Sequence, residues 1–302
     1  MAFREKMKYK LSALTDQFIY SKLYDKSKEL YPKVINEDQT VDFIVNHRAS
    51  VSRFGDGEMS WILGEKKKSF EISSDLLSQR LLEVLQSDLD GHIRCIPNVV
   101  ETINRREKKS KAFWMANIGK YAKYWNRYAN SYPYFDTNFT RFYIGYKDKH
   151  SLKINQRVNN IKKIWNNRDI LIIEGFQSRL GIGNDLFANA KSIKRILCPA
   201  KNAFEQYDNI LKVIKVNQCK FSKETLILCA LGPTATILAF DLHKLGYQAV
   251  DIGHLDVEYM WFQMQAEKKT MIPGKFINEA GGLSSEIDLP KTYYNSIIGK
   301  VK

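Results

Sequence analysis

Short apolar runs alternate with amphipathic stretches over the second half of the chain, from about residue 155 onward. The runs have the length of strands, and the stretches between them repeat apolar residues at helical spacing. Strands that alternate with helices predict a Rossmann-like α/β fold, a mostly parallel sheet with helices on both faces. The expected strands are 169–174, 193–198, 225–230 and 248–252, and the expected helices are 184–190, 202–216, 233–245 and one that follows residue 256.

The first half of the chain has a less regular pattern. Ser73 and Ser74 are candidate caps ahead of an apolar repeat of helical period. Aromatic residues are dense over 111–146, and we expect core packing for them ahead of contact with an acceptor substrate. The expected helices of this half are 41–46 and 75–86, and the expected strands are 50–54 and 92–96.

The sequence shows no sign of a boundary between domains. No stretch rich in Gly, Ser or Pro divides the sequence, and it contains no internal repeat. At 302 residues, with 44% hydrophobic and 26% charged positions, the chain can bury a substantial core. We expect one continuous domain over 38–302, preceded by a charged helical appendage over 1–37.

The net charge is strongly positive. Lys and Arg number 47 against 33 for Asp and Glu, which gives a formal charge of +14. Such an excess implies attraction to phosphate, whether in nucleic acid, in anionic lipid headgroups or in a phosphorylated small substrate. The sign of the charge does not choose among these three.

Cysteine spacing and hydropathy bear on the compartment. The four cysteines show no C-x-x-C pattern and no zinc spacing, so we interpret them as buried thiols of a reducing compartment. The first ten residues carry basic side chains without an apolar segment behind them, which does not fit a signal peptide. The longest uncharged run, 225–240, is too short to cross a bilayer. We expect a cytoplasmic protein whose basic face can touch a membrane peripherally.

The first candidate site is the segment R-F-G-D-G-E, which follows an expected strand. Asp56 and Glu58 flank a glycine and can reach a single divalent ion, while Gly55 relaxes the turn. Arg53 can pair with phosphate oxygens through its planar guanidinium. Our interpretation is a metal held by the two acids that neutralises a diphosphate. The alternative is a polar turn whose acids pair with neighbouring Lys or Arg.

The second candidate is a glycine-rich segment over 174–185, between an expected strand and an expected helix. Its spacing is not G-x-G-x-x-G, so it does not favour dinucleotide binding. Glycines that let the backbone approach a ligand, followed by a helix N-terminus, suit an anion. A tight structural turn is the alternative. The candidate phosphate or ribose contacts are Ser178, Arg179, Gly181, Gly183 and Asn184.

Two further loops follow expected strands. In L-G-P-T-A-T, Gly232 permits close approach and Pro233 suits a first helical turn, so that the free amides and Thr234 can meet an anion or a sugar hydroxyl. A structural turn is equally compatible with this segment. The strands' carboxyl ends lie on one edge of a parallel sheet, so we expect all these loops to converge there.

The last loop, D-I-G-H-L-D-V-E, brings an imidazole and two more acids to the same edge. His254 is either a ligand-binding group or a structural histidine. Asp256 or Glu258 could act as a general base toward an acceptor hydroxyl, and either could instead be the metal ligand. Acids at a helix start also stabilise the helix dipole, which is the structural alternative.

Five segments in the same order resemble the GT-D family of bacterial glycosyltransferases, formerly a domain of unknown function. The resemblance runs from about residue 38 to 265. The segments are R-F-G-D-G-E at 53–58, S-R-L-G-I-G-N-D-L-F at 178–187, C-P-A-K-N-A-F at 198–204, L-G-P-T-A-T at 231–236 and D-I-G-H-L-D-V-E-Y at 251–259.

The resemblance implies a UDP-sugar donor, such as UDP-glucose or a similar hexose, and a divalent metal, Mn²⁺ or else Mg²⁺, held by a D-x-E motif. Asp56 with Glu58 and Asp256 with Glu258 both form such a motif, and we assign the metal to the first pair because arginine and glycine surround it. The implied acceptor is a hydroxyl of a glycan or glycoprotein in surface adhesin or polysaccharide glycosylation. Other glycosyltransferases of that pathway would be further partners.

Two rival functions remain at the level of the sequence. A single-stranded nucleic-acid-binding protein would account for the positive charge and the aromatic residues, but not for four polar loops at one sheet edge. A Rossmann-type methyltransferase would need a glycine-rich loop followed by a ribose-binding acid one strand later, and the chain has no clear example.

Overall fold

The computed structural model describes residues 15–65, 71–129, 134–283 and 285–301. Within these ranges nine strands form one sheet, in the order β1-β4-β3-β2-β8-β7-β5-β6-β11. Every neighbouring pair of that sheet is parallel, and β9 and β10 form a separate antiparallel pair. The strands are β1 (Val34–Ile35), β2 (Ser50–Arg53), β3 (His92–Ile96), β4 (Tyr134–Asp136), β5 (Asp169–Gly175), β6 (Ser192–Cys198), β7 (Leu226–Ala230), β8 (Ala249–Asp251), β9 (Phe276–Ile277), β10 (Gly282–Leu283) and β11 (Ile297–Lys300).

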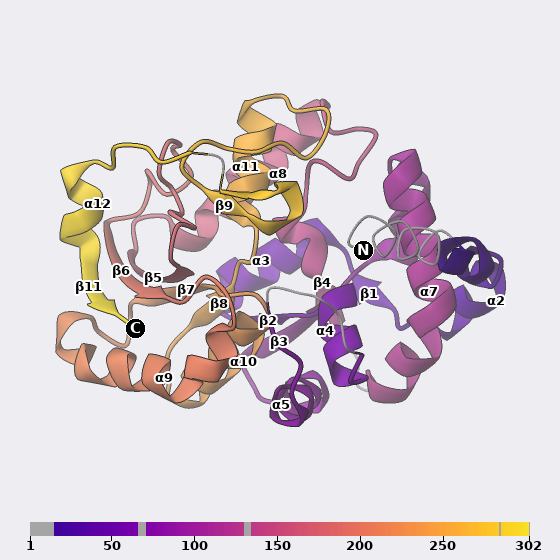
Figure 1. Ribbon diagram of the computed structural model, residues 1–302, viewed down its shortest axis with the longest axis horizontal. Coiled ribbons are helices and arrows are strands. Elements are labelled where there is room, and N and C mark those ends of the chain that lie inside the picture. The colour runs from indigo at the N-terminus through magenta and orange to yellow at the C-terminus, as the bar shows by residue number, and fades with distance from the viewer. Residues whose placement is uncertain (1–14, 66–70, 130–133, 284, 302) are drawn as a thin grey trace, which may run out of the picture.

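Helices cover both faces of the sheet. Figure 1 shows α5, α9 and α10 on one side of it and α3, α8 and α11 on the other. This arrangement confirms the predicted Rossmann-like α/β class. The α-helices are α2 (Tyr24–Ser27), α3 (Glu37–His47), α4 (Asp56–Ile62), α5 (Asp75–Gln86), α6 (Val99–Thr102), α7 (Lys108–Tyr128), α8 (Leu152–Lys162), α9 (Tyr207–Val216), α10 (Pro233–Lys244), α11 (Leu255–Gln263) and α12 (Lys291–Ser296).

Strand β5 shows why the sheet needs cover on both faces. Ile170 and Ile172 pack into one hydrophobic core, whereas Leu171 and Ile173 pack into another. All four side chains are almost completely buried. Because successive residues of a strand point to opposite faces, an unbroken apolar run of this kind is stable only between two helical layers.

The strands expected at 50–54, 92–96, 169–174, 193–198, 225–230 and 248–252 are present as β2, β3, β5, β6, β7 and β8. The expected helices around 41–46, 75–86, 202–216 and 233–245, and the one after residue 256, are present as well, with shifted ends. The expected cap of α5 is also confirmed, since the Ser74 side chain accepts a hydrogen bond from the amide of Leu77.

The helix expected at 184–190 is wrong, because turns occupy this segment. Just before the segment, Gly181 and Gly183 both have positive φ, so the chain enters it through a turn. The Asn184 side chain accepts a hydrogen bond from the Leu186 amide and so stabilises a turn. The indole of Trp165 donates to the carbonyl of Leu186 at 3.0 Å. Tertiary contacts therefore replace the helical pattern here.

The aromatic region 111–146 is mostly core, as expected. It contains most of α7, then β4 and the short 3₁₀ helix η3 (Thr137–Thr140). Tyr121, Trp125, Tyr134, Phe139 and Tyr143 have exposed fractions of at most 3%. Trp114 is an exception, since it lines the cavity described below.

Residues near the N-terminus pack on the main body of the chain. Val34 and Ile35, which lie within the expected appendage over 1–37, form β1 at the edge of the sheet. Figure 1 shows α2 beside α7. At the crossing, Gly119 of α7 lies so close to Tyr20 that a Cβ atom on the glycine would overlap the backbone carbonyl of Tyr20. The absence of a side chain at Gly119 permits this close packing.

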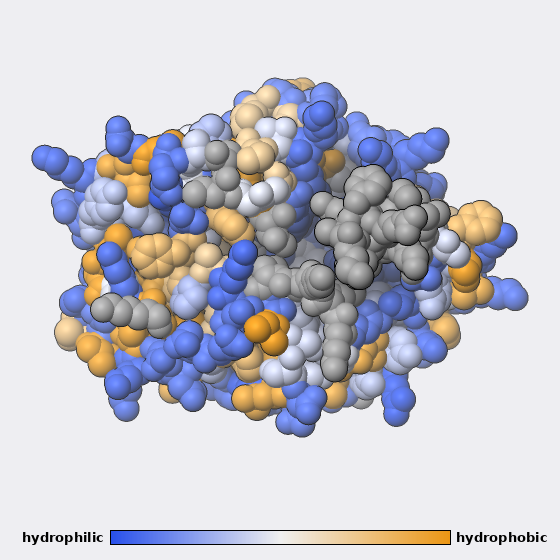
Figure 2. Space-filling model, in the orientation of Figure 1, coloured by the Kyte–Doolittle hydropathy of each residue, from blue (hydrophilic) through white to orange (hydrophobic). Residues whose placement is uncertain are grey.

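The surface is largely hydrophilic on the face that Figure 2 draws. Figure 2 shows hydrophilic residues over most of the visible face, with hydrophobic ones scattered among them. None of the helices within the described ranges is both long enough and apolar enough to span a bilayer.

We expect Gly119→Ala to destabilise the protein. Helix propensity alone predicts a gain of about 1 kcal/mol for alanine in α7. The overlap with the Tyr20 backbone opposes this gain, because a main-chain carbonyl cannot turn aside as a side chain can. Denaturant unfolding gives the sign, and limited proteolysis tests whether the segment around Tyr20 becomes accessible. A variant that is more stable than the wild type would contradict this packing.

Candidate active site

A cavity of about 460 Å³ lies at the carboxyl edge of the sheet. Its lining comes from the loops that follow β2, β4, β5, β6, β7 and β8. Strand β2 lies between β3 and β8, so this junction joins the first half of the chain to the second half. Ligands of open parallel sheets bind outside the carboxyl ends of the strands, and the volume is in the range of small-molecule sites.

Asp56 and Glu58 both line this cavity, at the start of α4. Asp56 is the first residue of the helix, and Gly55 is its N-cap. The Gly55 amide donates to Glu58 Oε2 at 2.8 Å, which fixes the direction of the Glu58 side chain. Burial, and then the negative charges of Asp56 and Asp251, raise the pKa of Glu58 to about 7. Three carboxyl groups, those of Asp56, Glu58 and Asp251, therefore lie close enough together at the cavity to influence one another.

Arg53 lies on the cavity floor and is held by the neighbouring strand. Its Nε donates to the Asp251 carbonyl at 3.0 Å, and its Nη2 lies 3.4 Å from Asp251 Oδ1. Burial acts to raise the pKa of Asp251, against the opposing effect of Arg53. Gly253 has a φ of 44° and lies against the guanidinium, where a Cβ atom would overlap it. The glycine thus keeps space for the arginine.

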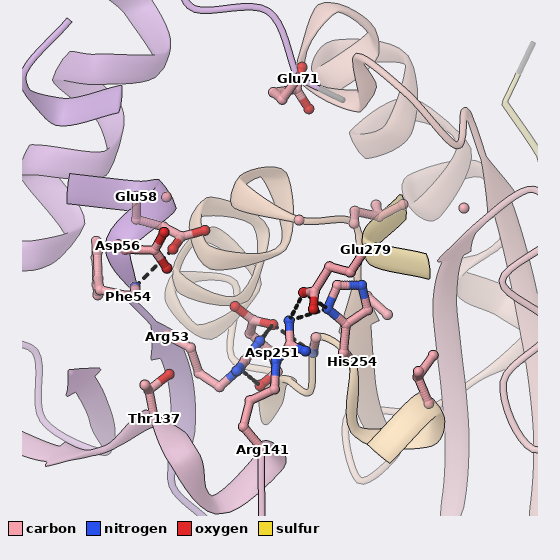
Figure 3. A pocket seen from close by; sticks show the side chains of 18 of the residues that line it. Arg53, Phe54, Asp56, Glu58, Glu71, Thr137, Arg141, Asp251, His254 and Glu279 are labelled. Atoms are coloured by element: carbon pink, nitrogen blue, oxygen red, sulfur yellow. Dashed lines mark hydrogen bonds and ion pairs between the residues drawn. The ribbon is translucent and has the colours of Figure 1, made fainter. Parts of the chain in front are cut away.

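A second arginine, Arg141, lines the cavity from the loop after β4 and follows Thr140, whose hydroxyl accepts a hydrogen bond from Arg53. Arg141 Nη2 donates to Glu279 Oε1 at 2.6 Å and also contacts His254 Nδ1 (Figure 3). Burial and then the charge of Arg141 lower the pKa of His254 to about 3, so the imidazole is neutral. Since Nδ1 accepts from arginine, we assign the imidazole proton to Nε2. Although burial acts to raise the pKa of Glu279, Arg141 holds it well below its usual range.

The two acids of the second D-x-E motif are engaged in structural contacts. Asp256 Oδ1 accepts from the Gly181 amide at 2.7 Å and from Asn184 Nδ2 at 2.8 Å, while its Oδ2 pairs with Lys275 Nζ at 2.6 Å. Asp256 and Lys275 side chains are each only 2% exposed. Both carboxylate oxygens are therefore occupied, and these contacts do not support the expected role of Asp256 as a base or metal ligand.

Glu258 is not among the residues that line the cavity. Its Oε2 accepts from the amides of Tyr143 and Ile144 at 3.1 and 3.0 Å, and its side chain is 1% exposed. The acid thus anchors the loop that carries Arg141, whose Nη1 lies 3.8 Å from Glu258 Oε1. A positioning role fits these contacts better than the expected general base.

The glycine-rich segment over 174–185 divides into two parts. Ser178 lines the cavity, as expected for a ligand contact. Arg179 does not, since it donates to the Gly274 carbonyl and to Glu286, both at 2.7 Å. Gly181, Gly183 and Asn184 also lie outside the lining, and no helix follows them to present an N-terminus. Of the five expected contacts in this segment, Ser178 alone lines the cavity, together with Gly175 and Leu180, while Gly181 and Asn184 donate to Asp256.

The segment over 231–236 takes the expected position at the start of α10. Gly232 is the N-cap with a φ of 57° and lines the cavity, and Pro233 is the first helical residue. Thr234 is fully buried, and its hydroxyl lies 3.3 Å from Glu71 Oε2.

Sequence reasoning missed Glu71, Arg141 and Glu279, because none of them follows a recognisable strand with a motif of its own.

The all-parallel sheet with a charged cavity at its carboxyl edge defines a Rossmann-like ligand-binding domain. The chain belongs to the family described as "Glycosyltransferase GT-D fold", whose model matches residues 51–280. This match confirms the resemblance seen in the five sequence segments. It also favours glycosyl transfer over the nucleic-acid-binding and methyltransferase alternatives.

Two curated relatives are similar to this chain. "Glycosyltransferase GlyD" of Streptococcus pneumoniae serotype 4 is 34% identical over 87% of this chain, and "Probable glycosyl transferase Gly" of Streptococcus gordonii is 36% identical over 82% of it. The alignments cover 32% and 35% of those two proteins, so the chain spans about a third of their length.

Solved structures agree with this assignment. One, described as "The highly conserved domain of unknown function 1792 has a distinct glycosyltransferase fold", superposes with a TM-score of 0.84 at 34% identity and covers 95% of this chain and 100% of its own. Another, "A New Glycosyltransferase (DUF1792) from Streptococcus sanguinis", gives a TM-score of 0.83 at 33% identity over 90% of this chain and 100% of its own.

We expect Asp256→Ala to lower the free energy of unfolding by about 3 kcal/mol or more, because it leaves the buried Lys275 ammonium unpaired. Denaturant unfolding measures this loss. The double variant Asp256→Ala/Lys275→Met should recover part of it, since the uncompensated charge is gone. The structural role would be contradicted if the losses in free energy of unfolding caused by the two single substitutions simply added in the double variant. It would also be contradicted if Asp256→Ala were as stable as the wild type.

Proposed function

We propose that the chain transfers a hexose from a UDP-sugar, such as UDP-glucose, to a hydroxyl of a glycan or glycoprotein acceptor, with the help of a divalent ion. The observation that carries the proposal is that Asp56 and Glu58 line the same cavity as two arginines and the loops after β5 and β7. Family membership supports the reaction class, and the cavity has a suitable position and volume for a nucleotide-sugar.

The chemistry of Asp56 and Glu58 fits a hard divalent cation. Carboxylate oxygens are the ligands that Mg²⁺ and Mn²⁺ prefer, and in nucleotide sites one or two carboxylates are completed by phosphate oxygens and water. The described part of the chain contains no group of three or more His, Cys, Asp or Glu residues that could hold a metal ion, and phosphate oxygens and water would have to complete the coordination at Asp56 and Glu58. Burial first, and then the charges of Asp56 and Asp251, raise the pKa of Glu58, and a bound ion would favour its charged form. When bound, the ion supplies charge neutralisation to the departing diphosphate.

The chain's own residues would act on the same leaving group. Arg53 is oriented by Asp251, and Arg141 by Glu279, so both guanidinium groups are positioned before the donor binds. The neutral His254 carries its proton on Nε2 and can donate it in a hydrogen bond to the donor. Gly232 lets the backbone at the start of α10 approach the ligand. Ser178 adds a hydroxyl from the loop after β5.

The wider context is also part of the proposal. Both curated relatives carry the name of a glycosyltransferase and come from Streptococcus. We infer that the acceptor belongs to the glycosylation of a surface adhesin or polysaccharide, that transfer takes place in the cytoplasm, and that other glycosyltransferases of the same pathway act on the same acceptor. The basic surface would allow peripheral contact with an anionic membrane.

Asp56→Asn and Glu58→Gln should each reduce metal-stimulated release of UDP from the donor by about 100-fold or more, because each removes one anionic ligand of the ion. UDP release at saturating Mn²⁺ is the measurement. Asp75→Asn is the matched control, since Asp75 is the exposed first residue of α5 and lies outside the cavity lining. Undiminished turnover in both cavity variants would remove the metal assignment.

The donor preference can be tested by thermal shift with UDP-, GDP- and CMP-sugars, each with and without Mn²⁺. We expect the melting temperature to rise most with a UDP-sugar and Mn²⁺ together, because ion and diphosphate complete each other's binding sites. The same rise in the presence of EDTA would contradict metal-assisted donor binding, and a preference for another nucleotide would contradict the UDP assignment.

A further inference from the structure

Glu71 lines the cavity but belongs to none of the groups described so far. It lies shortly before α5 and is 1% exposed. Figure 3 shows it set apart from Asp56 and Glu58 and also from the cluster of Arg141 and Glu279. It is therefore a separate acidic position in the same cavity.

Only one oxygen of Glu71 is engaged by the protein. Oε2 lies 3.3 Å from the Thr234 hydroxyl and 3.4 Å from the Phe204 amide, both of which donate to it. Oε1 is buried and has no hydrogen-bond partner among the described residues. Among the described residues, the charged group found to act on the carboxyl is another acid, the exposed Glu205, and burial raises the pKa of Glu71 to about 7. A buried carboxyl without a cationic partner is costly to the folded protein.

The surroundings of Glu71 leave room for a neutral polar ligand. Its partners Phe204 and Thr234 follow Ala203 and Gly232, which line the cavity and carry little or no side chain. The proposed metal ion is assigned to Asp56 and Glu58, from which Glu71 lies apart (Figure 3). The ring hydroxyls of a nucleotide-sugar are neutral hydrogen-bond donors that the proposed reaction brings into the cavity.

We propose that Oε1 of Glu71 accepts a hydrogen bond from a hydroxyl of a sugar ring in the bound donor, and so selects the sugar. The inference rests on the proposed function, since it assumes a nucleotide-sugar in this cavity. Thr234 and the Phe204 amide hold the other oxygen and thereby fix the direction of the carboxyl group. Two rings carry suitable hydroxyls, the ribose of the nucleotide and the transferred hexose.

The test compares affinities by titration calorimetry with Mn²⁺ present. The probes are UDP-glucose, its 2′-deoxyuridine analogue and analogues that lack one glucose hydroxyl each. In the wild type, removal of the selected hydroxyl should weaken binding by about 10- to 100-fold, the range expected for a hydrogen bond to a charged group. Glu71→Ala should weaken the binding of UDP-glucose by the same factor. The analogue that lacks the selected hydroxyl should bind Glu71→Ala as tightly as it binds the wild type. The analogue that shows this coupling identifies the ring.

Two further variants separate recognition from a structural role. Glu71→Gln retains an oxygen acceptor and should restore part of the discrimination. Glu205→Gln makes the same chemical change at an exposed position beside Glu71 and should leave discrimination unchanged. If Glu71→Ala weakens every probe by the same factor, or none of them, the inference is overturned while the proposed function stands. If the wild type binds neither UDP nor UDP-glucose, the proposed function fails, and the inference falls with it.

Discussion

The interaction on which the site depends is the contact between Arg53 at the end of β2 and Asp251 at the end of β8. These strands are neighbours in space, although about two hundred residues separate them in the chain. Their junction joins the first half of the sheet to the second half, and the loops after both strands line the cavity at the carboxyl edge. Because every strand of the main sheet runs in one direction, all the polar loops open into that cavity rather than onto two opposite edges. The arginine therefore sits in a location that the topology creates, and its partner acid fixes its direction.

Many of the charged groups around the cavity are engaged with other groups of the protein. Asp256 pairs with Lys275, Glu258 accepts backbone amides, and Glu174 pairs with Arg195 at 2.5 Å. Each buried pair holds together loops that enter the cavity from different strands. The charged groups that we propose for ligand binding are fewer. They are the acids at the start of α4, the two arginines and the carboxyl group of Glu71. This division explains how a chain of high net charge can present a small number of ionic groups with defined directions.

The sequence was a good guide wherever a local pattern decided the structure. The apolar runs of β5 and β7 are typical of buried strands. The segment R-F-G-D-G-E indicates a strand that is followed by acids at the start of a helix. The helix expected at 184–190 was wrong because the turn found there depends on Asp256 and Trp165, which are distant in the chain. Arg141 and Glu279 were missed for the same reason, since only the fold brings them beside His254. For Asp256, the sequence showed the right edge of the sheet but could not show that Lys275 already occupies the carboxylate.

The edge strand β1 matters for where the domain begins. The family model starts at residue 51, whereas Val34 and Ile35 pair with β4, and Glu37 of α3 accepts a hydrogen bond from the Tyr146 hydroxyl. A fragment trimmed to the matched residues would expose the edge of β4 that β1 covers, although β3 would still pair with the other edge, and would remove α3 from the core. Open strand edges of this kind recruit other chains. A fragment for biochemical work should therefore include residues that precede the matched region.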